Sequence, residues 1–150
     1  MRKILVGLLL LSLILSACAG GGKAAPPEDM PSTLLVSDET SQKTYSVADL
    51  QSLAAAQATF NDITYQGVIL TTLLQDAGLD PLSLKAVKAT AADGYAVNYD
   101  PVLFLRNDVL VAISTVGGPL AADDGFFRMV LPGEEGKLNL RMLSELRGIR

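Results

Sequence analysis

Hydrophobic and polar positions after residue 32 alternate over short stretches, without the long amphipathic segments of a helical protein. Thr33–Ser37, Ala86–Ala91 and Val109–Ser114 are rich in apolar side chains, and polar turn residues separate them. This pattern is typical of short β-strands. We expect a further strand at Phe126–Leu131, and a strand or short helix at Leu138–Leu146, where the periodicity is mixed.

Two turn sequences predict antiparallel hairpins. Asn61-Asp62 separates Gln57–Phe60 from Ile63–Gln66, and both turn residues tolerate the positive φ angles of a two-residue turn. Ala92-Asp93-Gly94 precedes Tyr95–Tyr99 and is the strongest hairpin signal in the chain. The sequence therefore predicts two pairs of neighbouring strands.

Capping residues predict three short helices. Ser46 is followed by Asp49 at the third helical position, which is the pattern of a capping box. Thr71–Ala77 is expected to be helical and to end at Gly78, and Asp100-Pro101 begins a helix of one turn. Short strands with a few short helices predict one α+β domain dominated by sheet, over residues 33–150. Its expected core includes Leu70, Leu73, Leu74, Val97, Leu110, Ile113, Val130 and Leu131.

The amino terminus has the features of a secretory leader. Met1-Arg2-Lys3 is basic, and residues 4–15 are apolar apart from Gly7 and Ser12. Such a stretch would span about 18 Å as a helix, less than the roughly 30 Å hydrocarbon core of a bilayer. We expect residues 1–17 to be a signal peptide.

The leader ends in Leu15-Ser16-Ala17-Cys18, which resembles the bacterial lipobox at all four positions. The resemblance implies that Cys18 is lipidated and becomes the first residue of the mature protein. Two or three acyl chains would anchor the protein stably to a membrane. Residues 18–32 would then be the lipidated cysteine and a flexible tether, rich in glycine and proline. Since Ala19 is not the aspartate of the inner-membrane retention signal, an outer membrane is favoured if the host has one.

Composition excludes several kinds of site. Without the leader the chain keeps 10 of its 12 basic residues against 16 acidic ones, so nucleic acid is not an expected partner. The chain has no histidine, which excludes a histidine-dependent triad and a histidine-bound zinc ion. With Cys18 as the single cysteine, it can form no intramolecular disulfide.

Five motifs, in order, resemble sulfite-oxidase-type molybdopterin-binding domains. They are the segment from Tyr65 to Gly78 with its Tyr-x-Gly-Val-x-Leu start, Asp93-Gly94-Tyr95, Gly117-Gly118-Pro119-Leu120, Phe127–Gly133 and Asn139–Leu143. The resemblance covers about residues 43–149. It implies a sheet-dominated domain of that fold and raises the possibility of oxidoreductase activity.

The chain departs from this family where the family binds its metal. In the enzymes, a cysteine thiolate from the loop between the first helix and the Tyr-x-Gly-Val segment binds molybdenum, and several Arg, Lys and His side chains bind the pterin pyrophosphate. Here the interval Ala54–Thr64 has no cysteine, and the domain shows no cluster of basic residues. We therefore expect no catalytic residue, no metal ligand and no cofactor, and molybdopterin only if the chain is an oxidoreductase or a subunit of one.

A candidate ligand surface is predicted at two glycine turns and a central arginine. Glycine turns allow close approach to the backbone, tyrosines offer flat contacts, and a mid-strand arginine could orient an anion. The residues are Asp93, Gly94, Tyr95, Asn98, Tyr99, Gly117, Gly118 and Arg128. The alternatives are that Arg128 is structural, bonded to carbonyl groups or to Asp123 or Asp124, and that the tyrosines belong to the core. Asp123-Asp124 and Glu134-Glu135 do not have the spacing of a calcium-binding loop and are expected to be solvated.

The sequence thus favours a membrane-anchored extracytoplasmic lipoprotein with a non-catalytic binding or interaction module. Its partner would be an extracytoplasmic protein or a small ligand. The alternative is a molybdopterin-dependent oxidoreductase of the sulfite oxidase type.

Overall fold

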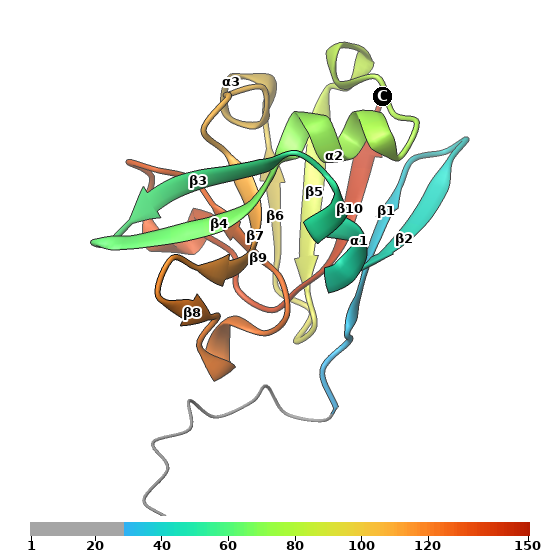
Figure 1. Ribbon diagram of the computed structural model, residues 1–150. Helices are drawn as coiled ribbons and strands as arrows, with labels where there is room; N and C mark the ends of the chain where they lie inside the picture. The colour runs from blue at the N-terminus through green and yellow to red at the C-terminus, as the bar shows by residue number, and fades with distance from the viewer. Residues whose placement is uncertain (1–28) are drawn as a thin grey trace, which may run out of the picture.

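Two β-sheets share one hydrophobic core in the computed structural model, which describes residues 29–150 (Figure 1). Their strands alternate with a few short helices, as the sequence predicts. The expected signal peptide, Cys18 and most of the expected tether lie outside the described residues. Within residues 29–150, no helix is both long and apolar enough to cross a bilayer.

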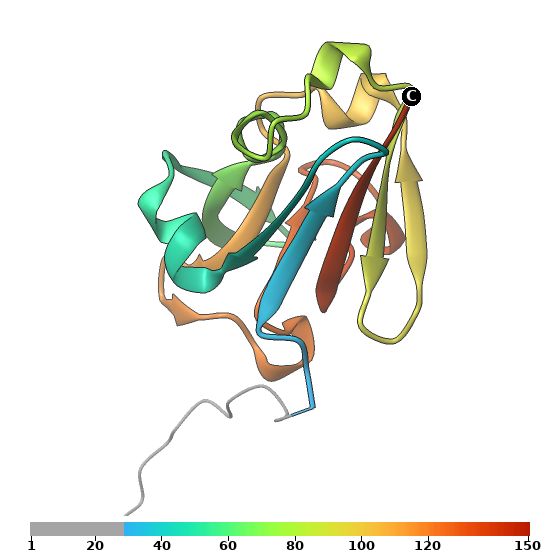
Figure 2. The same ribbon diagram turned by 90° about the vertical axis from the view of Figure 1, so that its right-hand side faces the viewer.

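The first sheet, sheet A, has five strands and one parallel pair. Its order is β2 (Gln42–Ser46), β1 (Thr33–Ser37), β10 (Leu143–Ile149), β5 (Ala86–Ala91) and β6 (Ala96–Tyr99). β1 and β10 run parallel, whereas the other neighbours are antiparallel. Figure 2 shows the side of this sheet that faces away from the second sheet, with no helix over its centre.

The second sheet, sheet B, is antiparallel, and its central strand β7 (Leu110–Thr115) pairs with three other strands. The order is β3 (Ala55–Phe60), β4 (Ile63–Ile69), β7 and β8 (Gly118–Pro119), and β9 (Arg128–Val130) pairs with the first half of β7. The β3–β4 hairpin turns at Asn61 and Asp62, whose φ angles are +48° and +62°, as predicted. The expected Phe126–Leu131 strand is shorter than predicted, since only its central residues form β9.

Two helices begin at the predicted caps, and the third begins at Leu70, one residue before the predicted Thr71. In α1 (Val47–Ser52), the Ser46 side chain accepts from the Asp49 amide and the Asp49 carboxylate accepts from the Ser46 amide, which completes the capping box. α2 (Leu70–Asp76) is followed by Gly78 at φ +83°, and Asp100 caps α3 (Pro101–Phe104). Turns of 3₁₀ helix occur at Pro81–Ser83, Ala122–Asp124 and Gly136–Leu138.

Seven of the eight predicted core residues are buried, and Ile113 is the exception. β4 and β7 slip by one residue between the pairs Gly67–Ala112 and Gln66–Ser114, so Ile113 is the extra residue of a β-bulge. The side chain of a bulge residue does not follow the regular alternation between the two faces of the sheet. Ile113 is therefore only partly buried, at the rim of the core rather than inside it.

Gly67, in the Tyr-x-Gly-Val motif, lies close to the backbone of β7. A Cβ atom added to Gly67 would stand 1.9 Å from the carbonyl oxygen of Val111, which belongs to the backbone of β7. No rotamer change can relieve a clash with a backbone atom, so only glycine allows this register. The motif glycine thus sets the distance between the two central strands of sheet B.

We expect Gly67→Ala to destabilise the fold by about 3 kcal/mol or more, because the β4 and β7 backbones must move apart. The free energy of unfolding from urea denaturation measures this. Gly136→Ala is the matched control, since a Cβ there meets nothing within 4 Å. An alanine at position 67 that costs no more than the one at position 136 would contradict the close approach.

Candidate functional site

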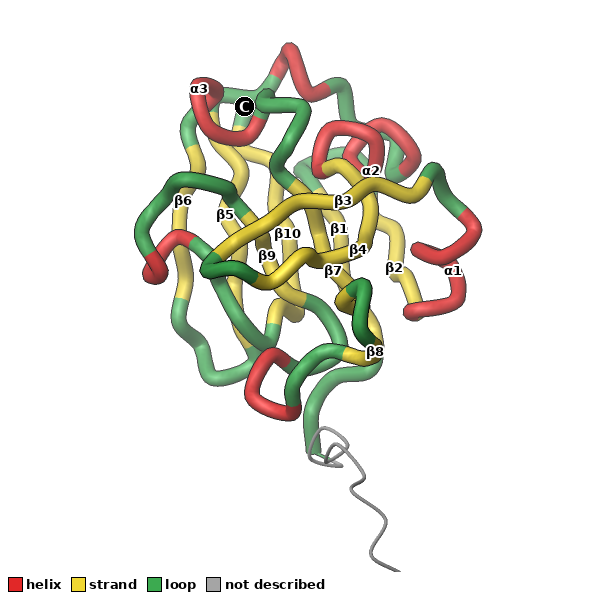
Figure 3. Tube along the Cα trace, turned by 60° about the vertical axis from the view of Figure 1, so that its left-hand side comes forward, coloured by secondary structure: helices red, strands yellow, loops and turns green. Residues whose placement is uncertain are grey.

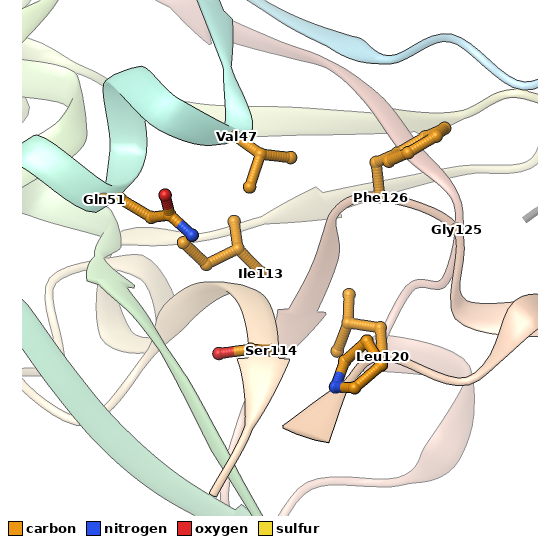
Figure 4. A pocket seen from close by; sticks show the side chains of 8 residues that line it. Val47, Gln51, Ile113, Ser114, Leu120, Gly125 and Phe126 are labelled. Carbon is orange, nitrogen blue, oxygen red and sulfur yellow. The ribbon is translucent and has the colours of Figure 1, made fainter. Parts of the chain in front are cut away.

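A cleft opens between α1 and the β7–β8 end of sheet B. A pocket of about 410 Å³ is lined by Val47 and Gln51 of α1, Ile113 and Ser114 of β7, and Pro119, Leu120, Gly125 and Phe126. Figure 4 shows these side chains converging on one space from segments far apart in the sequence. A second pocket of about 210 Å³ shares Gln51, Ile113 and Ser114 with the first and extends to Ala55, Gln66 and Gly67.

The cleft is neutral. Its walls are mainly apolar, and its polar groups are the amides of Gln51 and Gln66 and the hydroxyl of Ser114. The Ser114 hydroxyl lies 3.5 Å from the Gln66 side-chain oxygen. Among the described residues, no charged side chain lines either pocket. Such a site can bind an apolar or amide-bearing group but has no fixed charge to recognise an anion.

Met30, near the start of the described residues, lies beside this cleft. The sulfur of Met30 lies 3.3 Å from the point where a Cβ atom of Gly125 would stand, and Gly125 lines the larger pocket. Gly125 has φ +74°, so glycine suits this position by conformation as well as by space. The described chain therefore enters the domain next to the cleft.

The residues of the cleft do not fit a molybdenum–pterin cofactor of the family's kind. The resemblance implies a cysteine loop between α1 and the Tyr-x-Gly-Val segment, and in this chain that interval forms β3 and the turn of the β3–β4 hairpin. Residues 29–150 contain no cysteine or histidine, and no cluster of three or more acidic residues among them is placed to hold a metal ion. A soft metal would lack a soft ligand here.

The basic side chains also lie elsewhere. Six of those described form ion pairs with carboxylates: Lys43, Arg106, Arg128, Lys137, Arg141 and Arg150. The other three, Lys85, Lys88 and Arg147, lie on or beside β5 and β10 of sheet A. The cleft therefore offers no cation to a pyrophosphate.

Among the predicted site residues, Asp93, Gly94 and Tyr95 form the β5–β6 turn. Asp93 Oδ1 accepts from the Tyr95 amide at 2.9 Å, and Gly94 has φ +88°. The Tyr95 ring is half-exposed and lines a pocket of about 220 Å³ with Asp93 and Arg141. These three predicted residues therefore lie at a surface, though not at the cleft.

Asn98 and Tyr99 do not share that surface. Tyr99 is fully buried, and its hydroxyl donates to the Leu138 carbonyl oxygen at 2.6 Å. Burial raises the pKa of Tyr99 above its ordinary value, so it remains a neutral donor. Asn98 points to the exposed side of sheet A beside Lys88, because neighbouring residues of a strand face opposite sides. The expectation that both residues belong to one ligand surface is corrected here.

Gly117 lies in the two-residue turn between β7 and β8, and Gly118 begins β8 opposite Thr115. Gly118 has φ +142°, and its carbonyl oxygen accepts from the Thr115 hydroxyl at 3.0 Å. Neither glycine lines the larger pocket, but the two residues that follow, Pro119 and Leu120, do. The turn thus positions one wall of the cleft.

Arg128 is structural, which was the alternative interpretation of this residue. The residue is 4% exposed, and Nη1 donates to Asp124 Oδ1 at 2.7 Å and to the Tyr65 hydroxyl at 2.9 Å. The guanidinium also lies 4.6 Å from the centre of the Tyr65 ring. Burial raises the pKa of Tyr65, although the nearby charge of Arg128 acts to lower it. Because the pKa is raised overall, the phenol stays neutral.

Asn139 completes this buried network. Arg128 Nη2 lies 3.4 Å from the Asn139 carbonyl oxygen, and the Asn139 side chain accepts from the Leu131 amide at 2.7 Å. The Asn139 amide nitrogen donates to the carbonyl groups of Leu131, Glu134 and Glu135. The asparagine that begins the last family-like motif therefore fixes the turn after β9. Nothing in the composition of the sequence indicates this structural role of Asn139. Its place in a family-like motif is the one signal that points to the residue.

We expect Asp124→Asn to cost about 3–5 kcal/mol of unfolding free energy, since it leaves the buried Arg128 charge without a carboxylate. Arg128→Met should cost less, because the half-exposed Arg141 still lies 3.6 Å from Asp124. The double variant should cost less than the two single variants together, because it leaves neither charge. Urea denaturation of the four proteins gives this cycle. Lys137→Met is the control, since the exposed Lys137–Glu135 pair should contribute little. Strictly additive costs would show that the two buried side chains do not depend on each other.

Comparison with known proteins agrees with the predicted fold. The chain is similar to the sulfane dehydrogenase SoxCD from Paracoccus pantotrophus, with a TM-score of 0.68 and 20% sequence identity over 78% of this chain. The chain spans only 38% of the length of that structure's chain. No curated protein matches it. Residues 24–149 match the family described as oxidoreductase molybdopterin binding domain. The predicted resemblance is thus confirmed, and the chain belongs to the oxidoreductase molybdopterin-binding domain family.

Proposed function

We propose that this protein is a membrane-anchored extracytoplasmic lipoprotein whose molybdopterin-binding-type domain acts as a non-catalytic binding or interaction module. The observation that carries the proposal is the chemistry of the cleft. It has apolar walls and neutral amide and hydroxyl groups, and among the described residues neither a thiolate nor a cation lines it. Family membership establishes the domain, whereas chemistry depends on the site.

The module would bind a neutral or apolar segment of an extracytoplasmic protein, or a small ligand of the same character. Ile113 and Phe126 provide apolar contact area, and both are only partly buried. Gln51 and Gln66 can donate and accept hydrogen bonds with a peptide backbone. Charged residues are depleted at the centres of protein interfaces, which is the character of this cleft.

The second candidate is a molybdopterin-dependent oxidoreductase of the sulfite oxidase type, or a subunit of one. Family membership favours this candidate. It requires that the cofactor be held without a cysteine or histidine from residues 29–150, or that another chain supply the ligand. The two candidates differ in whether the purified protein retains molybdenum.

We expect full-length protein purified from molybdate-supplied cells to contain molybdenum far below one atom per chain. Acid-released pterin fluorescence should be equally low, because no thiolate in the domain can hold the metal. Elemental mass spectrometry and fluorescence measure the two quantities. An oxidoreductase of the same family, produced in the same cells, controls for cofactor supply. Stoichiometric molybdenum together with pterin would favour the oxidoreductase.

Membrane anchoring rests on the lipobox-like sequence at Cys18. We expect the mature protein to begin at Cys18 and to carry acyl chains on its thiol, which intact-mass analysis of the membrane fraction would detect. Cys18→Ser should move the protein from the membrane fraction to the soluble extracytoplasmic fraction, because a hydroxyl cannot receive the thioether-linked lipid. Ser16→Ala is the matched control and should remain membrane-bound. A wild-type protein that is soluble and has a free Cys18 thiol would contradict the anchor.

A further inference from the structure

β3 is an unprotected sheet edge. Among the other edge strands described, β8 has two residues and includes Pro119, β9 has three residues, β6 has four residues, and β2 carries Lys43. β3 has six residues, Ala-Ala-Gln-Ala-Thr-Phe, with no charge and no proline. Natural proteins protect edge strands with charges, prolines or short length, so an edge without these devices is suited to pairing with another strand. Figure 3 shows β3 as the outermost strand of sheet B.

The turn geometry indicates which backbone groups of β3 are available. In a hairpin with a two-residue turn, the flanking residues Phe60 and Ile63 form a hydrogen-bonded pair, and such pairs alternate along the ladder. The peptide groups of Thr59, Gln57 and Ala55 therefore point away from β4. Within residues 29–150, no further strand pairs with β3, and no loop donates a backbone hydrogen bond to it.

The surface next to this edge is neutral as well. Ala55, Gln57 and Thr59 have exposed side chains, and the Thr59 hydroxyl bonds to that of Thr64 on β4 at 3.0 Å. The next residue pair, Gln57 and Gln66, is also uncharged. A strand added to β3 would thus meet no like charge and bury no unpaired ion.

We infer that β3 pairs with β3 of a second copy of this chain, in an antiparallel arrangement with the two-fold axis at Gln57. This register places Gln57 opposite its own copy and Ala55 opposite Thr59 of that copy. The outward peptide groups of these three residues then bond to the same groups of the second chain. Antiparallel pairing of identical strands is closed by the two-fold axis, so it gives a dimer and not a fibre.

A second copy is the occupant that the proposed function favours. Pairing needs a partner edge that is itself unprotected, and each copy of this chain supplies one. If Cys18 anchors the protein, tethers of equal length hold all copies at the same distance from one membrane, which raises their effective concentration. This argument rests on the proposed lipid anchor, whereas the pairing geometry does not.

The first test is the oligomeric state of the full-length protein in detergent, measured by light scattering coupled to size-exclusion chromatography. We expect a dimer for the wild type and for Gln57→Thr, because threonine keeps the backbone N–H group at this position. Gln57→Pro should halve the measured molar mass of the protein in the particle, from dimer to monomer. Proline removes an outward N–H group of β3 without removing a hydrogen bond to β4. A monomeric wild type, or a dimeric Gln57→Pro with a wild-type circular dichroism spectrum, would overturn the proposal.

The second test measures register in the membrane and does not depend on the proline variant folding. The double variant Ala55→Cys/Thr59→Cys should form disulfide-linked dimers, because hydrogen-bonded antiparallel partners lie about 5.5 Å apart between Cα atoms, a separation that a disulfide can bridge. Each single variant and the wild type are the controls, and they should form none. Cross-linking that is equal in single and double variants would overturn the register. Stoichiometric molybdenum would refute the proposed function without changing either readout.

Discussion

The buried ion pair between Arg128 and Asp124 organises the outer side of sheet B. β9 supplies the arginine, the turn before it supplies the aspartate, and β4 supplies the Tyr65 hydroxyl on the same nitrogen. Backbone bonds from Met142 to Asp124 and from Leu143 to Phe127 then join this unit to the start of β10 in sheet A. A charge this deep is tolerated only because its partners are fixed in place. The two sheets are thus connected through a polar cluster as well as through their shared apolar core.

Local features of the fold follow from the sequence, because local residues determine them. The Ser46–Asp49 capping box, the Asn61-Asp62 turn and the stop at Gly78 depend on neighbouring residues, and all three form as predicted. β2 was not predicted, since Gln42–Ser46 is polar and becomes a strand only by pairing with β1. Ile113 was assigned to the core because a regular strand would bury it, and the bulge depends on a register that the sequence alone does not reveal.

The candidate site was harder to predict for the same reason. Its walls come from α1, β7 and the segment around Leu120 and Phe126, and no spacing rule connects these segments. The predicted surface instead combined residues by type, and Tyr99 and Asn98 fall on opposite sides of one strand. Arg128 could be interpreted in two ways from its sequence context. The choice between them needed the positions of Asp124 and Tyr65, which are four and 63 residues away in the chain.

The position of Met30 beside Gly125 limits how a partner can approach the cleft. Eleven residues separate Cys18 from Met30, and a chain of that length reaches at most about 40 Å when fully extended. With a lipid on Cys18, the mouth of the cleft would therefore stay within a shallow layer above the bilayer. A membrane-associated ligand or an extended peptide could enter that layer more easily than a large globular protein. The attachment point of the chain would then select partners by size and location before any contact in the cleft is made.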